Sequence, residues 1–334
     1  MFIVTNYTTA VFFCIITMLA WGSWANTQKL AGKNWHFELF YWDYVIGMFL
    51  FSILAAFTLG SFGEYGRSFT TDLAQAGKDN LLSAFIGGVI FNLANILFAA
   101  AIAITGMAVA FPVSIGLALV LGVIINYMEA PRQENAVLLF TGVGLVAFAI
   151  LLNAAAYRKA RSAQHGLTLK GVGIALAAGL LMSFFYRFVA ASMDLADMAS
   201  PAPHKLTPYT ATFIFSVGAL VSNFLFNTVL MKRPLTGDPL SYRDYFKGAP
   251  RLHLVGLLGG MIWGLGNCFN LIAAGKAGPA ISYGLGQGAT LIAALWGVFV
   301  WAEFKDAPKG TGRLIAAMFL FFLLGLGCVV YAGM

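Results

Sequence analysis

The chain has 334 residues, of which 60% are hydrophobic and 10% are charged, and its formal net charge is +7. Soluble domains carry roughly 25% charged residues, so this composition excludes an ordinary soluble protein and indicates one embedded in a lipid bilayer. Basic residues gathered in short loops on one side of a membrane would account for the positive charge, so no nucleic-acid partner is expected.

Ten apolar stretches are each long enough to cross a bilayer, which takes about 20 mainly apolar residues. They cover residues 8–29, 37–60, 81–104, 107–128, 135–157, 170–192, 208–231, 252–275, 278–300 and 311–333. We therefore predict an all-α polytopic membrane protein with ten transmembrane helices.

The segment from Gly87 to Glu129 occurs twice. Shifted by 172 residues, it matches itself at nine of the thirty positions 87–116, including Asn95 on Asn267 and Gly106 on Gly278. Five spans per half is an odd number, so the second copy enters the membrane from the opposite side. We expect two inverted five-helix repeats, residues 1–157 and 170–334, joined by a cytoplasmic linker at 158–169.

Charge predicts the orientation. The connections after the odd-numbered spans hold fourteen basic residues: Lys29, Lys33, Arg158, Lys159, Arg161, Lys170, Lys232, Arg233, Arg243, Lys247, Arg251, Lys305, Lys309 and Arg313. The other side holds five: Arg67, Lys78, Arg132, Lys205 and Lys276. Since cytoplasmic loops are enriched in Lys and Arg, we expect both termini to be external, in a cell inner membrane.

The first span ends in an aromatic and polar run. Trp24 and Lys29 suit an anchor at the membrane interface, with the ammonium group reaching toward the lipid headgroups. Trp21 and Asn26 lie deeper by our boundaries, where an amide facing hydrocarbon would be costly. We predict that Trp21 and Asn26 line a polar cavity, with interfacial anchoring as the alternative.

The second span carries Asp43, the one carboxylate more than a turn inside any predicted span. An acid within a membrane is costly unless it has a use, so we interpret Asp43 as a proton-coupling site. The alternative is a carboxylate at a helix start, stabilised by the helix dipole and water.

Asparagines mark the third span and its repeat. Asn92 and Asn95 lie one turn apart, as do Asn267 and Asn270 in the eighth span. Transporters bind their solutes near the middle of the membrane between repeats, so we expect Asn95 and Asn267 to face one another across a cavity. The alternative is hydrogen bonding between helices.

The ninth span, with Ser282, Tyr283 and the string Gly284-Leu285-Gly286-Gln287-Gly288, offers further candidates. No soluble strand–turn–helix unit surrounds the string, so it is not a dinucleotide fingerprint, and its small residues favour close helix approach. We predict that Tyr283 and Gln287 line the cavity. Arg187, late in the sixth span, either reaches toward the headgroups or binds a solute.

Three other segments have less specific interpretations. Asn223 and Asn227, one turn apart in the seventh span, belong either to the cavity or to packing. Residues 241–247 mix rings and charges, as expected of a helix on the membrane surface. The tenth span is nearly all apolar and is structural or a homodimer contact. The scattered His residues and the intramembrane Cys14, Cys268 and Cys328 indicate neither a metal site nor a disulfide, and no cofactor is expected.

Ten spans in inverted halves resemble the drug/metabolite transporter superfamily. The string Trp21-Gly22-Ser23-Trp24-Ala25-Asn26-Thr27 resembles the first helix of its bacterial glucose/ribose uptake branch. The segment Tyr41-Trp42-Asp43-Tyr44, and the asparagine-bearing third helix followed by the glycine-rich fourth, are similar to ureide permeases, although the chain lacks their long central loop. The resemblance implies secondary transport of a small polar solute, often with protons.

Amides, hydroxyls and rings dominate the predicted membrane interior, which favours an uncharged polar cargo. We expect a secondary transporter for a monosaccharide, with a proton gradient as the candidate driving force. The alternative is a ureide or nucleobase permease, or an exporter of the same superfamily. An intramembrane enzyme would need a nucleophile with its base or metal ligands at depth, and the sequence offers neither.

Overall fold

The computed structural model describes residues 1–32, 35–129, 134–160, 168–234 and 238–334, and ten of its helices are long and apolar enough to span a membrane. The spans are Tyr7–Ala31, Phe37–Phe57, Lys78–Thr105, Phe111–Glu129, Ala136–Ala160, Leu169–Ser192, Pro208–Lys232, Pro250–Ala277, Pro279–Val300 and Thr311–Tyr331. The predicted all-α fold with ten spans is confirmed. Most of the predicted linker, 161–167, lies outside the described residues.

Several spans are built from more than one helix. The elements in chain order are α1 Tyr7–Ser23, α2 Ala25–Ala31, α3 Phe37–Phe57, α4 Phe69–Gln75, α5 Lys78–Thr105, α6 Met107–Ala110, the π-helical turn η1 Phe111–Ile115, α7 Gly116–Glu129, α8 Ala136–Ala160, α9 Leu169–Ser192, α10 Pro208–Lys232, α11 Tyr242–Phe246, α12 Pro250–Ala277, α13 Pro279–Gly286, α14 Ala289–Leu295, the π-helical turn η2 Trp296–Val300 and α15 Thr311–Tyr331. Pro112 falls in η1, where its missing N–H is accommodated by a locally widened helix.

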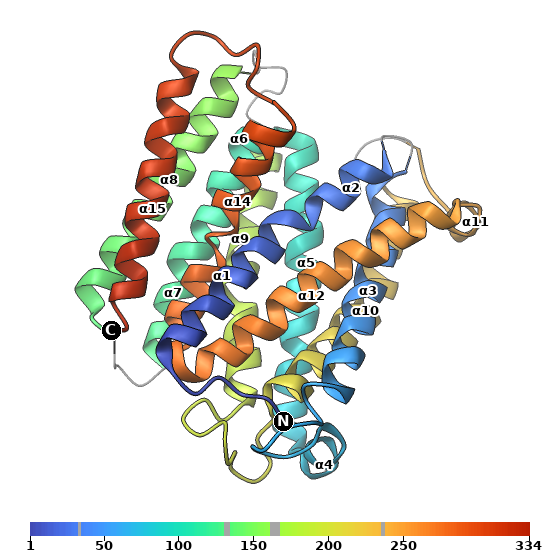
Figure 1. Cartoon of the computed structure of the whole chain (residues 1–334). Coiled ribbons are helices and arrows are strands. Elements are labelled where there is room, and N and C mark those ends of the chain that lie inside the picture. Colours follow the sequence, from blue (N-terminus) through green and yellow to red (C-terminus); the bar gives the residue numbers. More distant parts are fainter. Residues whose placement is uncertain (33–34, 130–133, 161–167, 235–237) are drawn as a thin grey trace.

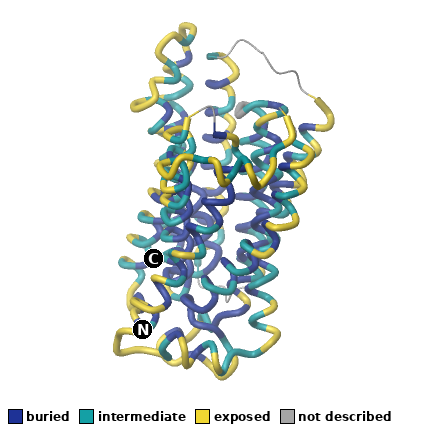
Figure 2. The backbone as a smooth tube through the Cα atoms, turned by 90° about the vertical axis from the view of Figure 1, so that its right-hand side faces the viewer, coloured by how far each residue is buried: buried dark blue, intermediate teal, exposed yellow. Residues whose placement is uncertain are grey.

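Both termini lie at one end of the bundle, together with α4, and α11 lies at the other end (Figure 1). The Tyr7 hydroxyl donates to the carbonyl oxygen of Val330 at 2.5 Å, which ties the first helix to the last. We call these ends the terminal end and the α11 end. The backbone is most buried along the middle of the bundle, and exposed residues gather at the ends and on the outer faces (Figure 2).

Two central helices organise the packing. Helix α5 packs against α9 and α10, whereas α12 packs against α1 and α3. The pair α8 and α15 stands side by side at one edge (Figure 1). Helices α5 and α12 each end at a glycine, Gly106 with φ 75° and Gly278 with φ 79°, a positive φ that glycine adopts at no steric cost.

Glycines allow very close crossings at these contacts. A Cβ added to Gly260 would lie 1.8 Å from the carbonyl oxygen of Tyr44, where α12 crosses α3. A Cβ on Gly88 would lie 2.0 Å from the carbonyl oxygen of Phe215, where α5 crosses α10. Gly88 and Gly260 are 172 residues apart, and Tyr44 and Phe215 are 171 apart. Two close crossings of the same kind therefore join helices of the first half of the chain to helices of the second half.

Candidate functional site

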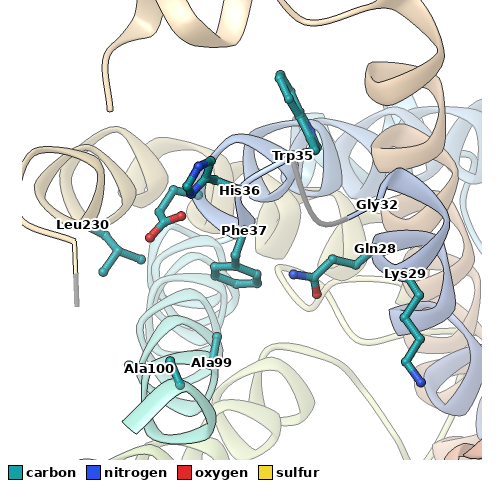
Figure 3. A pocket seen from close by; sticks show the side chains of 11 residues that line it. Gln28, Lys29, Gly32, Trp35, His36, Phe37, Ala99, Ala100 and Leu230 are labelled. Carbon is teal, nitrogen blue, oxygen red and sulfur yellow. The ribbon is translucent and has the colours of Figure 1, made fainter. Parts of the chain in front are cut away.

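A pocket of about 620 Å³ opens at the α11 end (Figure 3). The segment around Gly32, the start of α3 and the last turns of α5 line it, and Leu230 of α10 completes it. Phe37 and the Gln28 amide group point into this space, and Ala99 and Ala100 form part of its wall (Figure 3). The pocket combines an aromatic face with an amide that can both donate and accept hydrogen bonds.

One helical turn deeper than Phe37 and Ala99, three polar side chains meet. The Tyr41 hydroxyl donates to Asn92 Oδ1 at 2.9 Å and accepts from Asn95 Nδ2 at 3.2 Å. Asn92 Nδ2 donates in turn to the Ser222 hydroxyl of α10 at 3.0 Å. We call Tyr41, Asn92 and Asn95 the inner polar cluster. Its members come from α3 and α5, so a solute that replaced their mutual bonds would act on the contact between these helices.

Aromatic rings close the bundle next to this cluster. The rings of Phe91 and Trp263 lie 4.2 Å apart by their centroids, and Trp263 also stacks on Trp21 and Phe215. Phe91 and Trp263 are 172 residues apart, so they are equivalent positions of the repeated segment. In this conformation the ring layer separates the inner polar cluster from the terminal end.

Asn267 and Asn270 lie beyond these rings. Helices α5 and α12 run in opposite directions, because α5 begins at the terminal end and α12 at the α11 end. Asn95 and Asn267 each follow the central ring pair by one turn, so they lie on opposite sides of it. In this conformation the rings of Phe91 and Trp263 meet between the two helices, and the expectation that Asn95 and Asn267 face one another across a cavity stays a prediction.

The remaining predicted site residues are distributed along the bundle. Trp21 donates its indole N–H to the Trp263 carbonyl oxygen at 3.3 Å, and Gly286 of the glycine string lies against its ring. Tyr283, fully buried, donates to the carbonyl oxygens of Ala118 and Met182, both at 3.2 Å. Gln287 is buried where α13 gives way to α14. These three residues lie in the interior of the bundle, and their role in lining a solute cavity stays a prediction.

Two of the predicted residues lie away from the interior. Asn26 accepts from the Trp301 indole N–H at 2.6 Å, in a contact exposed at the α11 end, because α2 extends the first span beyond the predicted boundary. Arg187 pairs with Glu129 at 2.9 Å, and its side chain is 43% exposed. Arg187 and Glu129 line a second pocket, of about 580 Å³, near the terminal end. Arg187 therefore faces this second pocket and not the inner polar cluster.

Asp43 is 2% exposed and lies among polar groups of other helices. The Tyr245 hydroxyl of α11 donates to Asp43 Oδ1 at 2.6 Å, and His253 Nδ1 of α12 lies 3.0 Å from both carboxylate oxygens. Helix α3 can approach so closely because Gly256 of α12 lies directly against the Asp43 side chain. Asp43 is thus a partnered buried acid rather than a solvated carboxylate at a helix start.

Sequence reasoning missed Tyr41, Ser222, Tyr245 and His253. Tyr41 stands in the quoted aromatic segment, but its partners depend on how α3 is rotated against α5, which hydropathy does not record. His253 is the second residue of a predicted span that begins on the same side of the membrane as the span of Asp43, so the sequence could have paired the two. Among the described residues, no group of three or more His, Cys, Asp and Glu is arranged to hold a metal ion.

Ten spanning helices surround a buried polar and aromatic interior, with a pocket at each end, an arrangement typical of membrane transporters. The family model for ureide permeases matches residues 40–167 and 156–332. The chain therefore belongs to the ureide permease family, as the resemblance of its second and third helices had indicated.

Individual relatives agree with this assignment. Ureide permease 1 of Arabidopsis thaliana is 23% identical over 99% of this chain and 98% of its own, and the probable ureide permease A3 of Vigna unguiculata is 24% identical over 81% and 89%. The probable glucose uptake protein GlcU of Staphylococcus aureus is 41% identical, but only over 56 residues, 17% of this chain. A crystal structure with 16% identity aligns over 97% of this chain and 96% of its own with a TM-score of 0.60, so the fold is known from experiment.

Proposed function

We propose that this transporter carries a small uncharged ureide or nucleobase-like compound, which binds at the inner polar cluster. The observation that carries the proposal is the Tyr41 hydroxyl held between the amides of Asn92 and Asn95, one turn beyond a pocket open at the α11 end. A buried hydroxyl and two amides offer both donors and acceptors without a net charge. A solute with amide edges can take over these bonds without leaving a buried group unpaired.

The chemistry of the surroundings favours a planar solute. Ureides and nucleobases carry alternating N–H and C=O groups and flat rings. Phe37, whose ring points into the pocket and has its centroid 5.1 Å from that of Tyr41, supplies a face on which such a ring can stack. A monosaccharide remains the second candidate, supported by the 56-residue match to a probable glucose uptake protein.

We propose further that the two halves are inverted repeats and alternate access around the central rings. Three features support this: the glycine crossings of Gly88 and Gly260, the contact between the equivalent Phe91 and Trp263, and the helix pairs of the fold. The α5 contacts with α9 and α10 correspond to the α12 contacts with α1 and α3. Exchange of the two halves leaves this pattern unchanged, as an inverted repeat requires.

The orientation follows from the charge bias of fourteen basic residues to five, with the α11 end in the cytoplasm. Single cysteines at Lys247 and Ser200, both exposed, can test it in a protein whose native cysteines are replaced. With an impermeant thiol reagent on intact cells, Ser200→Cys should be labelled and Lys247→Cys should not. The reverse labelling would invert the orientation.

Asp43 is proposed as the group through which a proton gradient drives uptake, because it is a buried acid in the second turn of the helix that also carries Tyr41. The Asp43→Asn protein should exchange solute but no longer accumulate it on a pH gradient. The matched control is Asp238→Asn, an exposed acid before α11 at the same end of the bundle.

Flux of radiolabelled allantoin, uracil and glucose into proteoliposomes tests the cargo. The proposal expects allantoin or uracil to enter and each to compete with the other, with Asn95→Ala reducing the flux. Transport of glucose alone would show that the cargo is a monosaccharide. Transport of none of the three would reject the proposed solute class.

A further inference from the structure

Asp43 and His253 differ in their access to water. The Asp43 side chain is 2% exposed and the His253 side chain is 23% exposed, although the two are in contact. Water at the α11 end therefore reaches the imidazole before it reaches the carboxylate. A proton that travels between this water and Asp43 has the imidazole directly on its path.

The geometry also determines which ring nitrogen faces the acid. His253 Nδ1 lies 3.0 Å from both Asp43 oxygens, and the Tyr245 hydroxyl occupies Oδ1 as well at 2.6 Å. An unprotonated nitrogen would face two acceptors, so Nδ1 carries a hydrogen and donates it. In the neutral ring Nε2 is then free to accept a proton from water.

The groups that face the carboxylate are few. Tyr245 comes from α11 and His253 from α12, while α10 meets the next residue of α3, Trp42, with the uncharged Phe224 and Met231. Burial, reinforced by the adjacent Asp43 carboxylate, raises the pKa of Tyr245, so its hydroxyl stays a donor. Two hydrogen bonds from Ser241 lower the pKa of Asp244, so the cap of α11 stays formed at mildly acidic pH.

We propose that Asp43 and His253 form one proton-binding site, with His253 as the residue that passes the proton to the buried acid. A proton from water binds Nε2, and the hydrogen on Nδ1 moves to an Asp43 oxygen. The imidazole is left neutral with its hydrogen on Nε2, and the pair changes from one negative charge to none. The inference rests on the proposed coupling role of Asp43.

Neutralising the pair would loosen α3. Hydrogen bonds to a carboxylate are roughly twice as strong as those between neutral groups, so protonation weakens the ties of Asp43 to α11 and α12. Tyr41 precedes Asp43 by two residues, about 200° around the same helix, and points to α5 while Asp43 points to α12. When the bonds of Asp43 to α11 and α12 weaken, α3 can move relative to α5. Asn92 and Asn95 can then exchange their bonds to Tyr41 for bonds to a solute.

Infrared spectroscopy can follow the proton without any solute. In proteoliposomes of the full chain, lowering the pH should produce the carbonyl band of a protonated carboxyl group, absent from Asp43→Asn. After a pH jump, the band should appear about 100-fold more slowly in His253→Ala, the scale of a lost proton-transfer group. Free imidazole should restore the rate, which a purely structural role would not allow.

Two further variants keep the test decisive if His253→Ala folds poorly. Tyr245→Phe removes one bond to the charged carboxylate and should raise the proton affinity of the pair about tenfold. Tyr242→Phe, which changes a hydroxyl on the same short helix that bonds Thr228, should leave it unchanged. A wild-type rate in His253→Ala, no rescue by imidazole, or an unshifted Tyr245→Phe protein would overturn the proposal. Because no solute is used, these outcomes are independent of the proposed cargo.

Discussion

The asparagines of α5 and those of α12 occupy corresponding stretches of the sequence but differ in their hydrogen bonding. Asn92 and Asn95 are bonded to Tyr41, and Asn92 also to Ser222. By contrast, Asn267 Nδ2 and Asn270 Oδ1 are buried without a hydrogen-bond partner among the described residues. The amides of Asn92 and Asn95 bond to other protein groups, whereas Asn267 and Asn270 each have one buried amide atom without a partner among the described residues.

The difference fits a molecule whose halves take different roles in one conformation. In an alternating-access transporter the repeats exchange environments as access passes from one side to the other. Unpaired buried amides cost free energy, so under the proposed alternating access Asn267 and Asn270 are expected to gain a partner in another state. The comparison teaches that Asn95 and Asn267, although equivalent in the repeat, meet different groups, because the positions around them differ: Asn92 aligns with Gly264 and Asn270 with Phe98.

The largest expected effect concerns the crossings that the halves share. Gly88→Ala and Gly260→Ala would each bring a Cβ within about 2 Å of a backbone oxygen, so each should destabilise the fold by about 3 kcal/mol or more. Gly116→Ala, with open space around the new Cβ, should be tolerated. Size-exclusion chromatography in detergent measures folded yield. Equal yields from all three variants would show that the crossings can relax.

The second prediction separates the two asparagine environments. Asn95→Ala should weaken solute binding by about 1–3 kcal/mol, since it leaves the solute and Tyr41 short of a partner. Asn267→Ala should cost less thermal stability than Asn95→Ala, because the Asn267 amide nitrogen already has no partner. Solute-dependent thermal shifts in detergent give both quantities. Unchanged solute affinity in both variants would return these residues to a packing role.

The smallest effect is expected in the seventh span. Neither side-chain atom of Asn223 has a hydrogen-bond partner among the described residues, although the residue is fully buried. Asn223→Leu should leave thermal stability unchanged or slightly higher, since an apolar replacement removes an unpaired amide. Asn92→Leu should lower it, because Tyr41 and Ser222 lose their partner. Equal loss in the two variants would mean that Asn223 is paired through water.

Hydropathy predicted the number of spans because the bilayer demands about 20 apolar residues for each, whatever their neighbours are. Close helix approach was predicted from the small residues of the ninth span, whereas the crossings at Gly88 and Gly260 were found only in the structure. Partners of polar side chains could not be predicted in the same way. Asn26 pairs with Trp301 and Arg187 with Glu129, because the rotation and end of each helix, absent from hydropathy, place them there.

The most direct measurement concerns the path from the α11 end to the inner polar cluster. Ala99 lines the pocket one turn before Asn95, so a cysteine there reports whether a solute occupies that path. In a protein lacking Cys14, Cys268 and Cys328, Ala99→Cys would be labelled by an impermeant thiol reagent in inside-out vesicles. We predict that saturating allantoin or uracil slows this labelling and that Lys247→Cys labelling is unaffected. Transport of either solute with no change in Ala99→Cys labelling would contradict binding at the inner polar cluster.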